Sequence, residues 1–135
     1  MPVRLFPKLA KSGYKITSNE TDAYNCIAWG FSDDSVWCDP WRYWPDSVKR
    51  EWSINRLIEV FETRGFEVCE DGDPEDGFEK VAIYAVDEEP KHAARQLPNN
   101  KWTSKLGEWI DIEHELEGLE GNEYGRITTY LRRRR

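Results

Sequence analysis

The sequence is poor in the residues that build metal centres and disulfide frameworks. It contains three cysteines and two histidines, and the cysteines lack the closely spaced pairs of a zinc ribbon. An odd number of isolated cysteines does not suit a disulfide scaffold either. Cys26, His92, His114 and Asp111 could in principle surround zinc, but no two of them have the short spacing that most zinc sites use. We therefore expect no metal, no other cofactor and at least one free thiol.

The chain also lacks long apolar runs and an excess of basic charge. No run approaches the roughly 20 apolar residues of a membrane span, and residues 1–7 lack the apolar segment of a secretory signal. Acidic residues outnumber basic ones by 26 to 19, a net charge of -7. We interpret the basic run Arg132 to Arg135 as a solvated tail. These features predict a cytoplasmic protein with no general affinity for nucleic acids and none for membranes.

Aromatic residues, in contrast, are abundant. Seven Trp, six Tyr and five Phe make up 13% of the chain. Each buried ring removes on the order of 150 to 250 Å² from water, so these rings supply much of a core. A length of 135 residues suits one domain, residues 1–135. The acidic stretch 70–77, with its glycines and proline, indicates a loop between a helical front and a strand-rich back.

Two helices are predicted before this loop. Asn25 is a suitable N-cap directly before Cys26, and Thr17 to Glu20 fits an earlier capping box, so Cys26 lies on or at the start of a helix in either case. Apolar residues at i, i+3, i+4 and i+7 predict an amphipathic helix over 53–64. Residues 37–45 are too rich in aromatics and prolines for a regular element, and predict a loop that covers one end of the Cys26 helix.

The second half of the chain predicts an antiparallel sheet. Its connections at 87–90 and 98–100 are short and polar, which leaves no room for the helical crossovers of a parallel sheet. The expected fold class is therefore α+β, with N-terminal helices packed on a mainly antiparallel sheet. The segments with strand character are 66–69, 80–86, 91–97, 101–106 and 125–131.

Cys26 is the candidate nucleophile. The start of a helix supplies unpaired N–H groups and a dipole that favour the thiolate, so we expect a pKa below about 8.5 for Cys26. Its base must be a histidine. His92, at the start of a predicted strand beside two alanines, is favoured over His114, which we interpret as a helix-surface or hydrogen-bonded structural residue. The alternative is that Cys26 is a core residue, since cysteine is among the most buried residue types. Cys38 and Cys69 are interpreted as packing residues.

Five segments carry a family resemblance: Tyr24–Trp29, His92–Arg95, Trp102–Gly107, Asp111–His114 and Tyr124–Gly125. They resemble a bacterial family of small domains whose layout is similar to papain-like cysteine hydrolases, especially the NlpC-type peptidases and amidases. The resemblance covers most of residues 20–131. It implies a papain-like core with Cys26 as nucleophile and His92 as base.

The resemblance also implies a third polar residue that orients the histidine. Ser104 lies on the strand after His92, and Asp111 is the nearest carboxylate able to hold a histidine tautomer, so both are candidates. Lys105 could fix an anionic substrate group or the oxyanion, although a solvated strand lysine is the simpler interpretation. Candidate substrate contacts come from four tryptophans, any of which could instead belong to the core: Trp29, Trp41, Trp44 and Trp102.

The expected function is cysteine-dependent hydrolysis or acyl transfer at an amide, isopeptide or thioester bond. Its substrate would be a peptide or amide, or such a bond within a protein. The alternative is a non-catalytic binding or inhibitor protein that uses an acidic, aromatic-rich surface to occupy a partner. Selective labelling of Cys26 by a thiol reagent would favour the enzyme over the binding protein.

Overall fold

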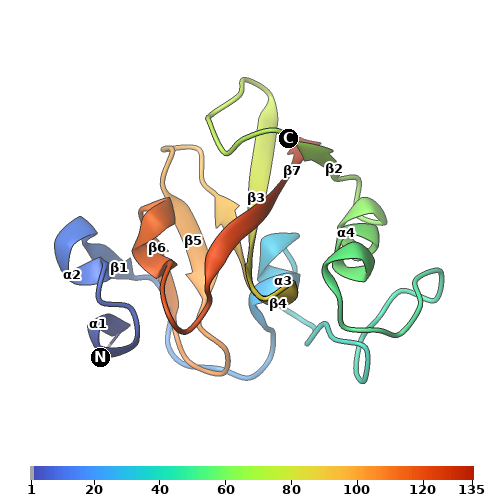
Figure 1. Cartoon of the computed structure of the whole chain (residues 1–135), viewed down its shortest axis with the longest axis horizontal. Coiled ribbons are helices and arrows are strands. Elements are labelled where there is room, and N and C mark those ends of the chain that lie inside the picture. Colours follow the sequence, from blue (N-terminus) through green and yellow to red (C-terminus); the bar gives the residue numbers. More distant parts are fainter. Residues whose placement is uncertain (1) are drawn as a thin grey trace.

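A computed structural model describes residues 2–135 and places one seven-stranded sheet at their centre (Figure 1). The strand order is β1-β6-β5-β4-β3-β7-β2, and each neighbouring pair is antiparallel, which confirms the predicted antiparallel sheet. The tight β3–β4 turn places Asp87 and Glu88 in the left-handed region, at φ 48° and 69°. The strands are β1 Tyr14–Ile16, β2 Glu67–Cys69, β3 Phe78–Val86, β4 Glu89–Gln96, β5 Trp102–Lys105, β6 Asp111–His114 and β7 Arg126–Arg134.

Short helices accompany the sheet: α1 Pro2–Leu5, α2 Leu9–Ser12, α3 Cys26–Gly30, α4 Ile54–Glu62 and the 3-10 helix η1 Leu116–Leu119. Helix α4 matches the predicted amphipathic helix and is capped by Ser53, whose Oγ accepts from the Arg56 amide at 3.2 Å. Asn25 caps α3 by accepting from the Ala28 amide at 3.1 Å. The capping box at Thr17 is wrong, because the chain from Thr17 to Asn25 forms no helix.

The sheet carries an apolar core on each face. Along β3, Val81 and Ile83 pack with α3, α4 and the 31–52 loop, whereas Ala82 and Tyr84 pack with residues of α1, α2 and η1. Successive residues of a strand point to opposite faces, so a strand covered on both sides reads as a continuous apolar run. Figure 1 shows the N-terminal helices at one side of the sheet, beside β1, and α4 at the other.

Arg132 to Arg134 belong to the sheet and only Arg135 follows it, so the interpretation of this run as a solvated tail is wrong for most of its length. Arg132 and Arg133 lie on β7, which pairs with β2 and β3. Arg132 bonds Glu67 at 2.8 Å, and Arg133 bonds Glu79 at 2.6 Å. The neighbouring strands thus supply the carboxylates that a charge run considered alone does not reveal.

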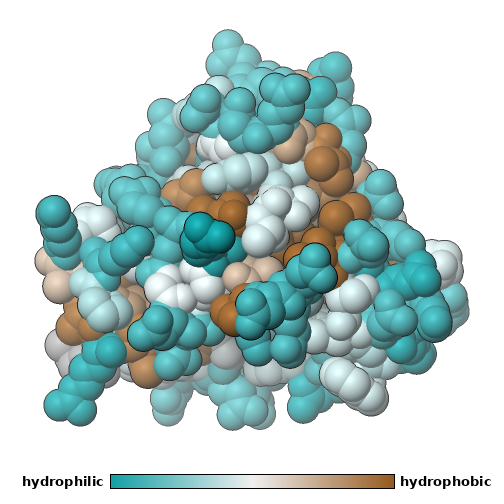
Figure 2. Space-filling view, in the orientation of Figure 1, coloured by the Kyte–Doolittle hydropathy of each residue, from teal (hydrophilic) through white to brown (hydrophobic). Residues whose placement is uncertain are grey.

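The surface shows no large continuous apolar face in the view of Figure 2, where hydrophilic residues surround small separate hydrophobic patches. No helix within residues 2–135 has the length and apolar character needed to cross a bilayer.

Candidate functional site

Cys26 is the first residue of α3, as the sequence predicts. The helix packs on β4, and Gly30 allows α4 to approach it closely from the other side. A Cβ atom at Gly30 would lie 3.1 Å from the Phe61 ring and 3.7 Å from the Ala93 Cβ. The packing of α3 on β4 brings the half-buried Cys26 side chain onto the sheet next to the middle of β4.

The ladder between β4 and β5 is short. Their ladder begins at Arg95 with Thr103 and is not continued toward the start of β4. The amide of Ala93 instead faces the Cys26 thiol, together with the amides of Cys26 itself and Ile27. The thiol is therefore surrounded by backbone donors, and His92 is the next residue along β4 from Ala93.

The Cys26 thiol is neutral at physiological pH. Burial raises the pKa of Cys26 to about 11, although the three surrounding amides and the charge of Lys105 oppose this change. The expectation of a pKa below that of a free cysteine is therefore wrong. Desolvation outweighs the helix start because α3 has only five residues and no cationic side chain is hydrogen-bonded to the thiol within residues 2–135.

His92 begins a chain of buried polar side chains. Its Nε2 lies 2.8 Å from Ser104 Oγ, and the same Oγ lies 2.7 Å from Nε2 of His114 on β6. Nδ1 of His114 lies 2.6 Å from the carbonyl oxygen of Glu115. His92, Ser104 and His114 are each buried to 1% exposure or less. We call these three residues the His92–Ser104–His114 chain.

The second ring nitrogen of His92 is unused. Among residues 2–135, His92 Nδ1 is buried and has no hydrogen-bond partner, so the imidazole and the Cys26 thiol are not hydrogen-bonded at rest. Burial and the neighbouring His114 lower the pKa of His92 well below its usual value. Burial also lowers the pKa of His114 to about 4. Both imidazoles are consequently neutral near pH 7.

Tyr124 fixes the plane of the His92 ring. The two rings stack with centroids 4.2 Å apart and planes 3° from parallel. Burial raises the pKa of Tyr124, so its hydroxyl is neutral beside the neutral imidazole. Gly125 allows the turn that carries Tyr124: its φ is 78°, and a Cβ atom there would lie 2.1 Å from the Ala85 carbonyl oxygen.

Of the two candidates for the third residue, Ser104 contacts His92. Asp111 lies on β6, where one carboxylate oxygen accepts from the Tyr24 hydroxyl at 2.6 Å. Its other oxygen is buried and has no partner in residues 2–135. Burial raises the pKa of Asp111. Asp111 thus lies in a separate polar cluster with Tyr24.

Lys105 is neither a solvated lysine nor a free anion-binding group. Its ammonium donates to the carbonyls of Thr21 at 2.7 Å, Trp109 at 2.9 Å and Gly107. An ammonium has three N–H donors, so none is left for an oxyanion. The expected substrate role of Lys105 is wrong because the 106–110 turn folds back over the side chain.

The four candidate tryptophans have different environments. Trp44 and Trp102 are core residues, with 4% and 3% exposure. Trp29 is half-buried and donates from its indole N–H to Thr103 Oγ1 at 3.1 Å. Trp41 is 80% exposed. Trp44 thus belongs to the same apolar core as Ile27 and Ala28 of α3, whereas Trp41 points into solvent.

Two hydrogen bonds connect the aromatic loop, residues 37–45, to the start of α3. The side-chain Nδ2 of Asn25 donates to the Cys38 carbonyl at 2.7 Å, and Asn25 Oδ1 accepts from the Cys38 backbone amide at 3.1 Å. Cys38 is fully buried, in agreement with its interpretation as a packing residue.

Comparison with known protein families gives one match. A family model, DUF7689, described as a domain of unknown function, matches residues 15–132. The chain belongs to the DUF7689 family. No curated protein and no solved structure matches it. Cys26 and the whole His92–Ser104–His114 chain lie within the DUF7689 match, whereas α1 and α2 precede it.

His114 was expected as a helix-surface or a hydrogen-bonded structural residue. The helix surface is wrong, because His114 lies on β6, but the hydrogen-bonded residue agrees with its contacts to Ser104 and the Glu115 carbonyl. The alternation of Ile110, Ile112 and His114 with charged residues is the strand signal that could have placed it. The described part of the chain shows no group of three or more side chains able to hold a metal ion.

Proposed function

We propose that this DUF7689 domain is a papain-like cysteine hydrolase or acyl transferase that acts on an amide, isopeptide or thioester bond. One pair of observations carries the proposal: Nδ1 of His92 is buried and unpartnered while Nε2 is held by Ser104, and the thiol at the start of α3 lies at Ala93, the next residue along β4. A buried polar atom without a partner costs about 1 to 3 kcal/mol. An unpartnered buried atom in a folded protein requires an explanation. A role as general base provides one, because the lone pair of Nδ1 is then free to accept a proton.

The charge states favour a neutral resting pair over a thiolate–imidazolium pair. As Cys26 attacks a carbonyl carbon, its proton passes to Nδ1 of His92, and the carbonyl π electrons move to the oxygen. The amides of Cys26, Ile27 and Ala93 already face the sulfur. They are the donors available to the oxyanion.

The remaining steps use the same two side chains. The imidazolium returns its proton to the leaving amine or thiolate, and an acyl group remains on Cys26 as a thioester. His92 then takes a proton from water or from an acceptor amine, which attacks the thioester carbonyl. As the carbon–sulfur bond breaks, the imidazolium returns this proton to the Cys26 sulfur and restores the neutral pair. Because His92 is fully buried and Cys26 is not, the substrate approaches from the thiol side, where Trp29 lies one helical turn away.

The experiment uses p-nitrophenyl acetate as a small activated acyl donor. Intact mass and peptide mapping should show acetyl transfer to Cys26 with release of p-nitrophenolate, followed by loss of the acetyl group. Cys26→Ser should lose the label, His92→Ala should slow it by roughly 100-fold or more, and the matched control Cys69→Ser should behave as wild type. Equal acetylation of Cys26 and Cys69 in folded protein would overturn the proposal.

A second candidate is a non-catalytic binding protein, and the exposure of Trp41 favours it. A tryptophan that is 80% exposed, held by a bond from its amide to Asp39 Oδ1 at 2.8 Å, is a preformed anchor for a partner. This candidate predicts that Trp41→Ala abolishes partner binding and that Cys26 shows no preferential acetylation.

A further inference from the structure

We propose that His114 and the backbone carbonyl of Glu115 set the direction of every proton in the His92–Ser104–His114 chain. His114 is then a positioning residue that keeps Nδ1 of His92 unprotonated. This inference rests on the proposed function for its catalytic meaning, whereas the proton arrangement follows from the hydrogen bonds themselves.

The order of donors and acceptors is set at the His114 end of the His92–Ser104–His114 chain. A carbonyl oxygen can only accept a hydrogen bond, so Nδ1 of His114, 2.6 Å from the Glu115 oxygen, must carry a proton. A neutral imidazole has one N–H. Nε2 of His114 therefore holds a lone pair, and it accepts from the Ser104 hydroxyl at 2.7 Å.

The donor and acceptor roles of the Ser104 hydroxyl then determine which nitrogen of His92 carries the proton. Ser104 has one proton, which is already donated to His114, so at its 2.8 Å contact with His92 it accepts. Nε2 of His92 must then carry the N–H, and Nδ1 must carry the lone pair. The opposite tautomer of His92 would leave two acceptors facing one hydroxyl proton in a fully buried site.

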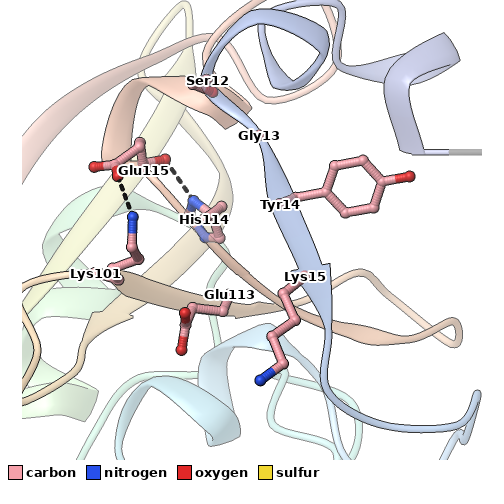
Figure 3. Close-up of a pocket in the computed structure, with 8 residues that line it drawn as sticks. All are labelled: Ser12, Gly13, Tyr14, Lys15, Lys101, Glu113, His114 and Glu115. Carbon is pink, nitrogen blue, oxygen red and sulfur yellow. Dashed lines mark hydrogen bonds and ion pairs between the residues drawn. The ribbon is translucent and has the colours of Figure 1, made fainter.

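The surroundings of His114 hold this end of the chain in place. His114 pairs with Trp102 of β5 on one side and with Tyr14 of β1 on the other. Figure 3 shows the His114 ring and Lys101 both directed at Glu115, whose carboxylate lies 2.6 Å from Lys101 Nζ, while Tyr14 points away. The other charged groups that line this shallow surface pocket are Lys15 and Glu113. The carbonyl oxygen of Glu115, on which the direction depends, is itself held by a bond from the Gly118 amide at 3.1 Å.

The arrangement differs from a direct carboxylate or amide contact to the catalytic histidine. Here a serine relays the constraint, and the group that decides the tautomer is a main-chain carbonyl that substitution of a side chain cannot remove. His114 is the link that can be changed by mutation. Its Nδ1 donates to the Glu115 carbonyl, and its Nε2 therefore accepts from the Ser104 hydroxyl.

Nitrogen-15 NMR of histidine-labelled protein tests the proton arrangement without any substrate. Two-bond and three-bond proton–nitrogen correlations distinguish the two neutral tautomers. We expect His92 to be protonated at Nε2 and His114 at Nδ1. A wild-type His92 protonated at Nδ1 would overturn the inference.

Two substitutions separate positioning from simple packing. His114→Leu removes the acceptor for Ser104, so Ser104 can donate to Nε2 of His92, and the ring proton of His92 then lies on Nδ1. Acetylation of Cys26 should fall by about 100-fold or more. His114→Gln offers an amide oxygen to Ser104, so it should keep the His92 tautomer and most of the rate. An unchanged His92 tautomer and rate in folded His114→Leu would overturn the inference. If the tautomers are as expected but wild-type Cys26 is never acetylated, the arrangement is supported and the proposed function fails.

Discussion

Acidification should destabilise this domain because it holds two histidines in their neutral form. The pKa of His114 falls to about 4 on burial, and burial also lowers the pKa of His92. In the unfolded chain both would have a pKa of about 6.5. A lowered folded pKa gives stability that is fully present above about pH 6.5 and is lost as the pH falls toward the folded pKa, since the unfolded state then binds more protons.

The magnitude for His114 follows from these two pKa values. Protonation of the unfolded state alone costs the fold about 2 kcal/mol at about pH 5, and about 3 kcal/mol once the pH reaches the folded pKa. His92 adds a loss of the same sign. Against a total stability of about 5 to 15 kcal/mol for a typical domain, this loss is large.

Urea unfolding at about pH 7.5 and about pH 5 measures the effect, with His114→Gln as the matched variant. Wild type should lose about 2 kcal/mol more on acidification than His114→Gln, because glutamine does not titrate and the other groups are shared. Equal losses in the two proteins would refute the claim that His114 is neutral and desolvated.

Two further predictions concern stability. Lys105→Met should lower the free energy of unfolding by about 3 kcal/mol or more, because it leaves the carbonyls that Lys105 binds without a donor. Thermal melting checks this. The control is Lys91→Met, which removes an exposed ion pair and should change the stability little. Trp44→Ala should lower the free energy of unfolding, measured in urea, by about 3 to 5 kcal/mol because the Trp44 ring lies in the core. Trp41→Ala should change it by no more than about 0.5 kcal/mol. Similar losses for the two variants would contradict the difference in burial between these rings.

The sequence predicts those elements whose signals are local. The amphipathic spacing and the Ser53 cap give α4, and Asn25 gives the start of α3. The long apolar or alternating runs give β3, β4 and β7, and their short connections give the antiparallel order. The three-residue strand β1 carries no comparable pattern, and it exists because β6 supplies its hydrogen bonds.

The candidate site was predictable in its residues but only partly in its physics. The family resemblance offered Ser104 and Asp111 as alternatives for the third residue, and only the fold shows that Ser104 contacts His92 while Asp111 binds Tyr24. The pKa of Cys26 depends on how fully the tertiary packing of α3 on the sheet buries the thiol, which no local sequence pattern specifies. The carbonyls that occupy Lys105 come from a turn whose path no local pattern specifies.

The pH dependence of Cys26 acetylation by p-nitrophenyl acetate tests the central claim, that neutral His92 takes the proton of a neutral thiol. Wild type should react at a nearly constant rate from about pH 7 to about pH 9, because His92 is unprotonated and Cys26, whose pKa is about 11, is protonated throughout this range. His92→Ala should react slowly, with a rate that rises about tenfold per pH unit as the thiolate forms. A wild-type rate that rises in parallel with that of His92→Ala would show that His92 accepts no proton from Cys26, and would contradict the account.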